Sequence, residues 1–315
     1  MSEKLRYNGI DNYGHLKRKK TIKVYPIILG IIFCSLIMIG GKLFFEKVDN
    51  STLSYDKISY YIDITDKVSE GKVQVNWQEV AAINEVLNSG KEDELVPKIA
   101  EIFLKSSEND GYTLFTVDEV LEKLNVNNEE EEEVKSFLSE IEDNTLYKDL
   151  YKDEAKIAFI NEIYPAALEN YKSYGILPSI TMAQAILESG WGESELAVEH
   201  NNIFGIKADS RWDGAVATMT TKENYDDVIE ANFRKYDSIL QSIEDHGEFL
   251  HENERYRANG LFDGNEYKSQ AQALENAGYS TAKDENGDKI YADKLTNVIQ
   301  KYNLMIFDSK VKGGL

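Results

Sequence analysis

Glu188 is the side chain whose surroundings in this sequence best suit chemistry. It lies near the end of the segment PSITMAQAILESGWG, residues 178–192, which opens on the helix-start pair Pro178–Ser179 and reaches a helix-stopping glycine at Gly190. Apolar residues recur at helical spacing around nearly the whole circumference of this segment, which predicts a buried helix. Burial and the negative end of the helix dipole should both raise the pKa of the Glu188 carboxyl group. A carboxylic acid that stays protonated near neutral pH can act as the general acid in the cleavage of an acetal.

Taken alone, Glu188 also fits an ordinary solvated glutamate in the last turn of a helix. A second carboxylate downstream favours the chemical interpretation. Residues 215–223 contain a valine and three threonines, and residues 229–233 alternate apolar with polar side chains, a pattern typical of strands. With residues 224–227 as the connecting turn, these strands form a predicted hairpin that carries Glu223 at its tip or shoulder.

Helices are predicted on both sides of this hairpin. Capping and periodicity patterns mark helices around residues 157–171, from Ser238 onward, over residues 267–277 and from Tyr291 to Tyr302. We therefore expect a mainly α domain of the α+β class, with a small β-hairpin lobe, over residues 150–305. A C-terminal tail is expected over residues 306–315.

Neither a metal nor another cofactor is expected. His246 and His251 in HGEFLH are five residues apart, so they do not share a helix face with Glu248 as a zinc site of the zincin type requires. We interpret these histidines as structural residues. The segment DENGD, residues 284–288, lacks the glycine position of a calcium loop and is better explained by a hairpin turn at Asn286–Gly287.

Four motifs occur in order and together resemble one known family. They are ILPSITMAQAILESGWGES, NNIFGIKA, FRKYDS and NAGYSTAKDENGDKIYADKL, within residues 153–304. In this order they closely resemble the bacterial glucosaminidase domain of glycoside hydrolase family 73, which includes peptidoglycan-cleaving autolysins and flagellar muramidase-like proteins. The resemblance implies a lysozyme-like fold and hydrolysis of the β-1,4 bond between N-acetylglucosamine and N-acetylmuramic acid in peptidoglycan glycan strands.

The resemblance also implies roles for single residues. Glu188 matches the family's catalytic general acid, and Glu223 matches a second acidic position that is proposed in some members as the base. Tyr279 in AGYS matches an aromatic residue that lines the scissile bond and positions the acetamido group of the substrate. The mechanism stays open between an inverting acid/base pair and attack by the substrate's own 2-acetamido group. The candidate substrate-binding residues are Trp191, Asn202, Phe204 and Tyr291.

The sequence departs from the family pattern at one place. The family commonly has a compact AGYATDPxYA segment, whereas this chain inserts KDENGDKI, residues 283–290, between Thr281 and Tyr291. Trp191 and Trp212 suit either a platform for sugar rings or the core. Two other functions stay open at this stage. One is a catalytically silent protein that binds the cell wall as a scaffold, and the other is a lytic transglycosylase, which shares the fold and a single acid.

The N-terminal residues differ in charge from the rest of the chain. The 315 residues carry a formal net charge of −21, yet residues 1–23 hold seven basic and two acidic side chains. The acidic remainder argues against nucleic-acid binding. Residues 24–45 form an apolar run long enough to span a bilayer, and it lacks the A-x-A-like site of a cleaved signal peptide. We expect a cytoplasmic basic tail at 1–23, a single-pass anchor in the cell membrane at 24–45 and an extracellular catalytic domain.

Two further segments lie between the expected anchor and the catalytic domain. Residues 46–72 are polar without a sustained period and are expected to form a stalk or linker. Helical periodicity over residues 73–146 predicts a small accessory module, whose partner, if it has one, would be an envelope protein. The sole cysteine, Cys34, lies in the expected anchor, which excludes a cysteine nucleophile from the exported part.

Overall fold

The computed structural model describes residues 53–92, 94–107, 111–145, 153–223 and 227–312. Within these limits the chain from Ser54 onward forms one compact unit. The expected cytoplasmic tail at 1–23 and membrane anchor at 24–45 lie outside the described residues. Among the described helices, none is both long and apolar enough to cross a membrane.

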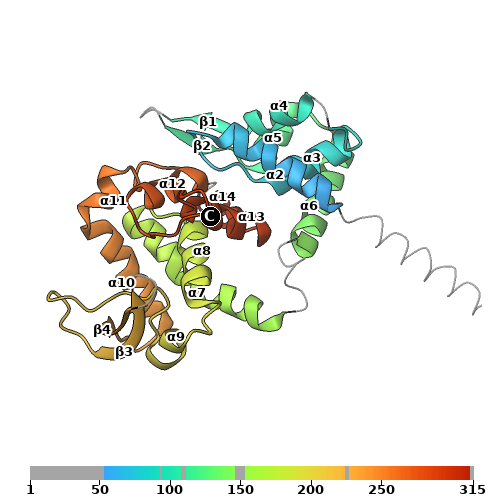
Figure 1. Ribbon diagram of the computed structural model, residues 1–315. Helices are drawn as coiled ribbons and strands as arrows, with labels where there is room; N and C mark the ends of the chain where they lie inside the picture. Colours follow the sequence, from blue (N-terminus) through green and yellow to red (C-terminus); the bar gives the residue numbers. More distant parts are fainter. Residues whose placement is uncertain (1–52, 93, 108–110, 146–152, 224–226, 313–315) are drawn as a thin grey trace, which may run out of the picture. The chain divides into compact units, whose positions relative to one another are not determined.

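Helices form most of the N-terminal part of this unit (Figure 1). Its elements are α2 (Tyr55–Ser69), α3 (Trp77–Leu87), α4 (Leu95–Ile102), β1 (Leu104–Ser106), β2 (Tyr112–Leu114), α5 (Val117–Leu124) and α6 (Asn128–Thr145). The helices predicted from periodicity within residues 73–146 are therefore present. Helix α5 begins with a capping box, in which the Thr116 hydroxyl accepts the Glu119 N–H at 3.3 Å while the Glu119 carboxylate accepts the Thr116 N–H at 2.8 Å. The short antiparallel pair β1–β2 was not predicted.

The segment 46–72, which we expected to be a stalk, contains helix α2 instead. Ser54 caps this helix by accepting the backbone N–H of Lys57, and one face of the helix is buried. Tyr61 is fully buried on that face, and Asp66 is 5% exposed. Tyrosine, threonine and aspartate at buried positions hide the apolar period that would have predicted a helix.

The C-terminal part is mainly helical and has one longer hairpin, as predicted. Its elements are α7 (Glu154–Tyr174), α8 (Pro178–Ser189), α9 (Glu195–His200), β3 (Val216–Glu223), β4 (Asp227–Arg234), α10 (Ile239–Glu252), α11 (Glu254–Ala258), α12 (Tyr267–Asn276), α13 (Tyr291–Lys301) and α14 (Met305–Lys312). Helix α8 packs against α7, α12, α13 and α14, so the helix that carries Glu188 lies in the middle of this part (Figure 1).

Helix α8 is stabilised from both ends. Its N-terminal residue is Pro178, as predicted, but the N-cap Leu177 offers no side-chain hydrogen bond. Asp308 of α14 replaces that cap, because its carboxylate accepts the Ser179 N–H at 2.9 Å and also the Ser179 hydroxyl. At the other end Gly190 adopts φ 58°, a left-handed conformation that suits glycine.

Instead of the expected C-terminal tail at 306–315, the chain forms helix α14 over Met305–Lys312. Ile306 and Phe307 are buried, and Asp308 is fully buried while it caps α8. The helix covers eight residues, so its periodicity is too short to predict it from sequence.

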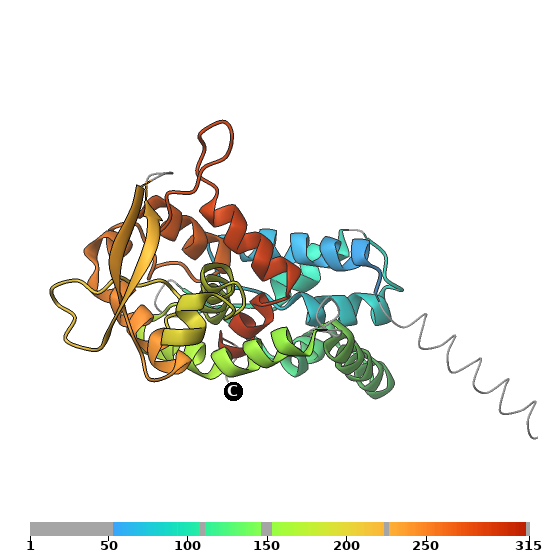
Figure 2. The ribbon, with the colours of Figure 1, turned by 60° about the horizontal axis from the view of Figure 1, so that its bottom comes forward.

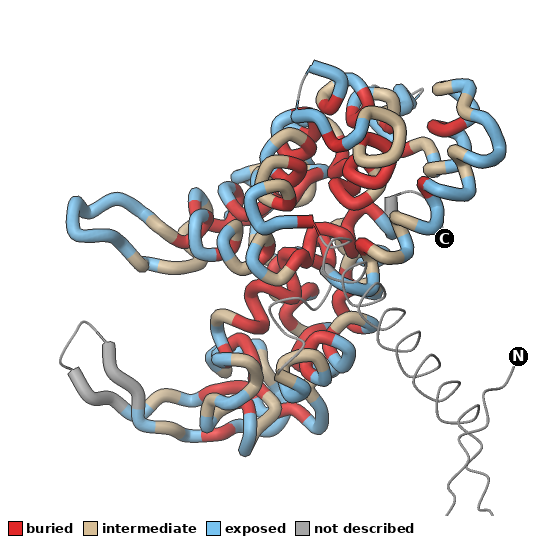
Figure 3. The backbone as a smooth tube through the Cα atoms, turned by 90° about the vertical axis from the view of Figure 1, so that its right-hand side faces the viewer, coloured by how far each residue is buried: buried red, intermediate tan, exposed pale blue. Residues whose placement is uncertain are grey.

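The β3–β4 hairpin and the turn at 283–290 extend from the same side of this part of the molecule (Figures 2 and 3). Strands β3 and β4 pair in antiparallel register from Val216 opposite Arg234 to Glu223 opposite Asp227, which confirms the predicted hairpin. In the 283–290 turn the Asp284 carboxylate accepts the backbone N–H groups of Asn286 and Asp288. Gly287 adopts φ 89°, so the predicted Asn286–Gly287 turn is also confirmed.

Candidate active site

Glu188 occupies the last turn of α8, where its side chain reaches solvent. Its Oε1 atom accepts a hydrogen bond from the Tyr291 hydroxyl at 2.7 Å. Protein atoms surround the carboxyl group closely, and this partial desolvation raises its pKa. The hydrogen bond from Tyr291 and the charge of Lys294 act in the opposite direction but do not cancel the effect of burial. The direction agrees with the one expected from sequence.

Two tyrosines line the approach to Glu188. Tyr291 is the first residue of α13, is buried, and its hydroxyl also accepts the Gln184 side-chain N–H at 3.1 Å. Tyr279 follows α12, and its ring stacks on that of Tyr291 with centroids 5.2 Å apart and an angle of 19° between the ring planes. Burial raises the pKa of both hydroxyls well above the usual value, and the charge of Glu188 adds to the effect. Both groups are therefore neutral hydrogen-bond donors.

His246 joins this cluster although we had expected it to be only structural. Its Nε2 atom lies 3.2 Å from the Tyr279 hydroxyl, and its ring stacks on Phe204 with centroids 3.8 Å apart. Complete burial lowers the pKa of the imidazole to about 3, so it is neutral at physiological pH. The sequence did contain a signal: His246 follows Ile243 by three residues and precedes Leu250 by four, which places it on the apolar face of α10.

The loop between α9 and β3 holds two of the candidate substrate-binding residues. Phe204 is buried and provides the ring on which His246 stacks. Asn202 is buried too, and its amide N–H groups donate to the backbone oxygens of Ile206 at 3.0 Å and Arg234 at 2.8 Å. The amide of Asn202 thus holds the loop against strand β4 and stabilises the conformation of the loop.

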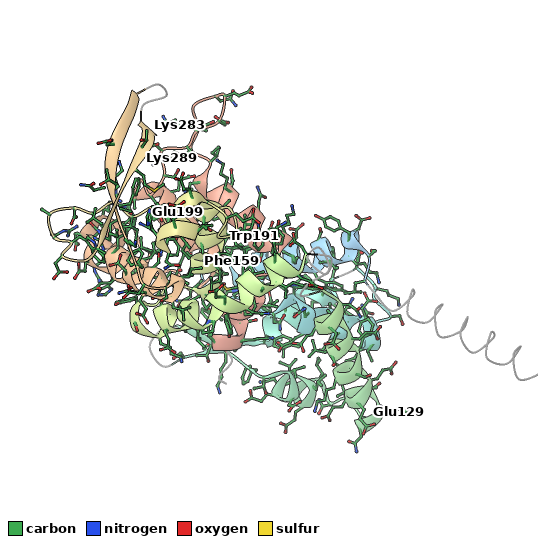
Figure 4. The ribbon with its side chains drawn as sticks, turned by 90° about the horizontal axis from the view of Figure 1, so that it is seen from below. Glu129, Phe159, Trp191, Glu199, Lys283 and Lys289 are labelled. Carbon is green, nitrogen blue, oxygen red and sulfur yellow. The ribbon has the colours of Figure 1, made fainter. Side chains whose placement is uncertain are left out.

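The two tryptophans considered as sugar platforms are both packed against other side chains. Trp191 makes edge contacts with Phe159 and Tyr302 at centroid distances of 6.2 and 4.8 Å, and Figure 4 shows it beside Phe159. Trp212 lies 5.6 Å from the ring of Tyr236, and its indole N–H donates to the Ala215 backbone oxygen at 2.9 Å. Each retains partial exposure, so a role in sugar binding stays a prediction.

Glu223 is the last residue of β3 and pairs with Asp227 across the hairpin. This is the tip position that the sequence predicted. Its side chain lies outside the described part of the chain. Within the described residues, no group of three or more histidine, cysteine, aspartate or glutamate side chains is placed to hold a metal ion.

Residues 164–304 match the family described as mannosyl-glycoprotein endo-beta-N-acetylglucosaminidase, or glucosaminidase. The chain carries a glucosaminidase domain. This match confirms the family that the four motifs indicated. The family boundaries enclose Glu188, Glu223, Tyr279 and Tyr291, together with His246.

Known proteins similar to the glucosaminidase domain include an exo-glucosaminidase and peptidoglycan hydrolases. The exo-glucosaminidase LytG of Bacillus subtilis is 38% identical over 164 residues, which cover 50% of this chain and 54% of LytG. The peptidoglycan hydrolase FlgJ of Escherichia coli K12 is 36% identical over 163 residues, covering 49% of each protein. This chain thus spans about half the length of the curated relatives it matches.

Solved structures are also similar to about half of this chain. The catalytic domain of the autolysin Auto from Listeria monocytogenes is 34% identical and matches 49% of this chain and 87% of that domain, with a TM-score of 0.42.

Proposed function

We propose that this protein is a peptidoglycan hydrolase that cleaves the β-1,4 bond between N-acetylglucosamine and N-acetylmuramic acid within glycan strands. The observation that carries the proposal is Glu188 itself. Its carboxyl group is reachable from solvent, has a raised pKa and accepts the Tyr291 hydroxyl, all inside a glucosaminidase domain. The similarity to the exo-glucosaminidase LytG supports the bond type, and the similarity to the peptidoglycan hydrolase FlgJ supports the substrate class.

In the proposed reaction Glu188 begins protonated. Its proton passes to the glycosidic oxygen as the bond from that oxygen to the anomeric carbon of N-acetylglucosamine breaks, and a water oxygen finally takes the place of the leaving sugar. Tyr279 positions the substrate's acetamido group beside this bond. Either Glu223 activates the water directly or the acetamido group attacks first and water opens the resulting ring.

We place the protein at the cell membrane, with residues 24–45 as anchor, residues 1–23 in the cytoplasm and the glucosaminidase domain outside. The charge difference between the basic N-terminus and the acidic remainder supports this orientation. Peptidoglycan lies on the same side of the membrane as the domain in this arrangement. An envelope protein as partner of the helical module stays a prediction from sequence.

The test incubates the full chain, in detergent, with purified peptidoglycan and analyses the fragments. New reducing N-acetylglucosamine ends support the proposal, and fragments of mixed length indicate cleavage within strands instead of release from their ends. Fragments ending in 1,6-anhydro-muramic acid would identify a lytic transglycosylase, and intact glycan would identify a binding or scaffold protein.

Single substitutions link the activity to Glu188. Glu188→Gln should lower the rate of cleavage by at least about 100-fold, because the general acid is lost. Glu199→Gln on α9, an exposed glutamate labelled in Figure 4, is the matched control and should leave the rate unchanged. Cleavage by Glu188→Gln at the wild-type rate would rule out Glu188 as the general acid.

The configuration of the product separates the two routes for the second step. An inverting acid/base pair gives the opposite anomer of the substrate, whereas attack by the acetamido group gives retention. Inversion together with a severe loss in Glu223→Gln would assign Glu223 as the base. Retention with a mild loss would assign the acetamido route.

A further inference from the structure

A line of side chains leads from Glu188 into the interior of the glucosaminidase domain and ends at His246. Tyr291 donates to Glu188, the ring of Tyr279 stacks on Tyr291, and the Tyr279 hydroxyl contacts Nε2 of His246. The general-acid step uses the first members of this line. It leaves the buried imidazole without a role.

His246 is held on two sides by aromatic rings. Its ring lies parallel to that of Phe204, with 6° between the planes and 3.8 Å between the centroids. The ring of Tyr279 meets it edge-on at 83° and 5.9 Å. Because α10 buries His246 completely, the imidazole has little freedom to turn away from Tyr279.

The imidazole makes one polar contact to the described part of the chain. That contact is to the Tyr279 hydroxyl, and Nδ1 is buried without a hydrogen-bond partner among the described residues. Burying an unpaired polar atom is unfavourable, whereas an apolar ring would fill the same space without that penalty. The contact to Tyr279 is therefore the property that distinguishes histidine from phenylalanine at this position.

The unpaired Nδ1 also assigns the proton of the neutral imidazole. A buried N–H without an acceptor is rarer than a buried acceptor without a donor, so the proton belongs on Nε2. Nε2–H then donates to the Tyr279 oxygen. The phenolic proton of Tyr279 is then directed away from His246, and the charge of Glu188 acts on the same hydroxyl.

We propose that His246 is a positioning residue that holds the Tyr279 hydroxyl as a hydrogen-bond donor to the acetamido group of the substrate. The proposal rests on the proposed function for the identity of the substrate. Phe204 contributes to the same positioning, because its ring stacks on the imidazole and fixes the plane of that ring. His246 itself touches neither the substrate nor the reacting atoms.

A double-mutant cycle tests the link between His246 and Tyr279 in the full chain. His246→Phe keeps an aromatic ring on Phe204 and removes the donor, whereas His246→Gln keeps a donor at similar reach. We expect His246→Phe to lower kcat about tenfold with KM within about twofold, and His246→Gln to recover part of the loss. In a Tyr279→Phe background, His246→Phe should change kcat less than about twofold.

His251→Phe is the matched control, because His251 lies exposed on the same helix, and its kcat should stay at the wild-type value. Thermal unfolding of each variant accompanies the kinetics. Equal losses of kcat in the wild-type and Tyr279→Phe backgrounds, or no loss at all, would overturn the proposal in favour of a purely structural histidine.

Nitrogen NMR of histidine-labelled protein tests the same contact without any activity. His246 should show a protonated Nε2 and an unprotonated Nδ1 from about pH 5 to pH 8, with its signals identified by their absence in His246→Phe. A protonated Nδ1 would overturn the assignment of His246 as donor to Tyr279. If the wild-type protein cleaves no glycan while the NMR pattern is as expected, the proposed substrate is wrong, but the hydrogen bond from His246 to Tyr279 is supported.

Discussion

Glu188 is exposed to solvent, yet it is surrounded by enough protein to raise the pKa of its carboxyl group. Tyr291 opposes that effect, because its hydroxyl donates to the carboxylate and stabilises the charged form. The pKa of this group is thus set by burial on one side and by the Tyr291 hydrogen bond and the charge of Lys294 on the other. Each side of that balance is open to experiment.

Tyr291→Phe should shift the pH dependence of cleavage. In the proposed mechanism activity needs protonated Glu188, so it falls as the pH rises through the pKa of that group. Removing the hydrogen bond that stabilises the carboxylate raises the pKa further, and the alkaline limb of kcat against pH should move to higher pH. Tyr302→Phe, at the far end of α13, is the control and should leave the limb in place. If the alkaline limb of Tyr291→Phe moved to lower pH, the Tyr291 hydrogen bond would not be what lowers the pKa of Glu188.

A second carboxyl group predicts a pH-dependent stability. Burial, together with the nearby charge of Glu142, raises the pKa of Glu79 in α3 from its ordinary value near 4.5 to about 7. The folded protein therefore holds a proton that the unfolded chain has lost between these pH values, so stability falls as the pH rises through that window. The loss should be on the order of 3 kcal/mol between pH 4 and pH 8.

Glu79→Gln should remove this dependence. The variant should be more stable than wild type at pH 8 and equally stable at pH 4, as measured by urea unfolding. Glu101→Gln, on an exposed face of α4, should behave as wild type at both pH values. A variant whose unfolding free energy follows the wild-type curve would show that Glu79 titrates normally in the fold.

At the scale of elements, the order of the helices and the hairpin could be predicted from sequence, but their partners could not. The periodicity of α8, the hairpin strands and the Asn286–Gly287 turn are local patterns, and all are present. The cap of α8 is different, because Ser179 and Asp308 are 129 residues apart. His246 joined the site in the same way, through contacts that local spacing does not record.

The cap from α14 makes α8 dependent on the end of the described chain. Asp308→Ala removes the acceptor for both the N–H and the hydroxyl of Ser179 and leaves those groups buried, so it should lower the unfolding free energy by about 1–3 kcal/mol. Asp293→Ala on the exposed side of α13 is the control. Equal unfolding midpoints for the two variants in urea would show that Asp308 does not support α8.

At the scale of the whole molecule, Asp66 of α2 connects the N-terminal helices to the glucosaminidase domain. Its buried carboxylate accepts the Tyr267 hydroxyl, the Gln300 amide N–H at 3.1 Å and the Lys268 ammonium at 2.9 Å. Trp77 adds a second link, because its indole N–H donates to Asn303 Oδ1 at 3.1 Å. The residues of the first two hydrogen bonds are 201 and 234 positions apart, so no local pattern could predict them.

Asp66→Ala should destabilise the protein strongly. The substitution leaves the buried Tyr267 hydroxyl without its acceptor and removes one of the two acceptors of the Gln300 amide, and breaking such a network lowers the unfolding free energy by about 3 kcal/mol. Asp63→Ala, which lies on the exposed side of the same helix, is the matched control. A change below about 0.5 kcal/mol for Asp66→Ala would mean that the connection contributes little.

The helices that contact Asp66 are also the ones that place the tyrosines of the site. Tyr279 follows α12, and Tyr291 begins α13. A fragment of residues 153–315 should therefore unfold at least about 5 °C below a fragment of residues 54–315, because it uncovers the buried side chains of Tyr267 and Asn303. Its cleavage of peptidoglycan, measured well below both midpoints, should also be slower, because α12 and α13 lose their support. Equal midpoints and equal rates would show that the N-terminal helices and the glucosaminidase domain fold and act independently.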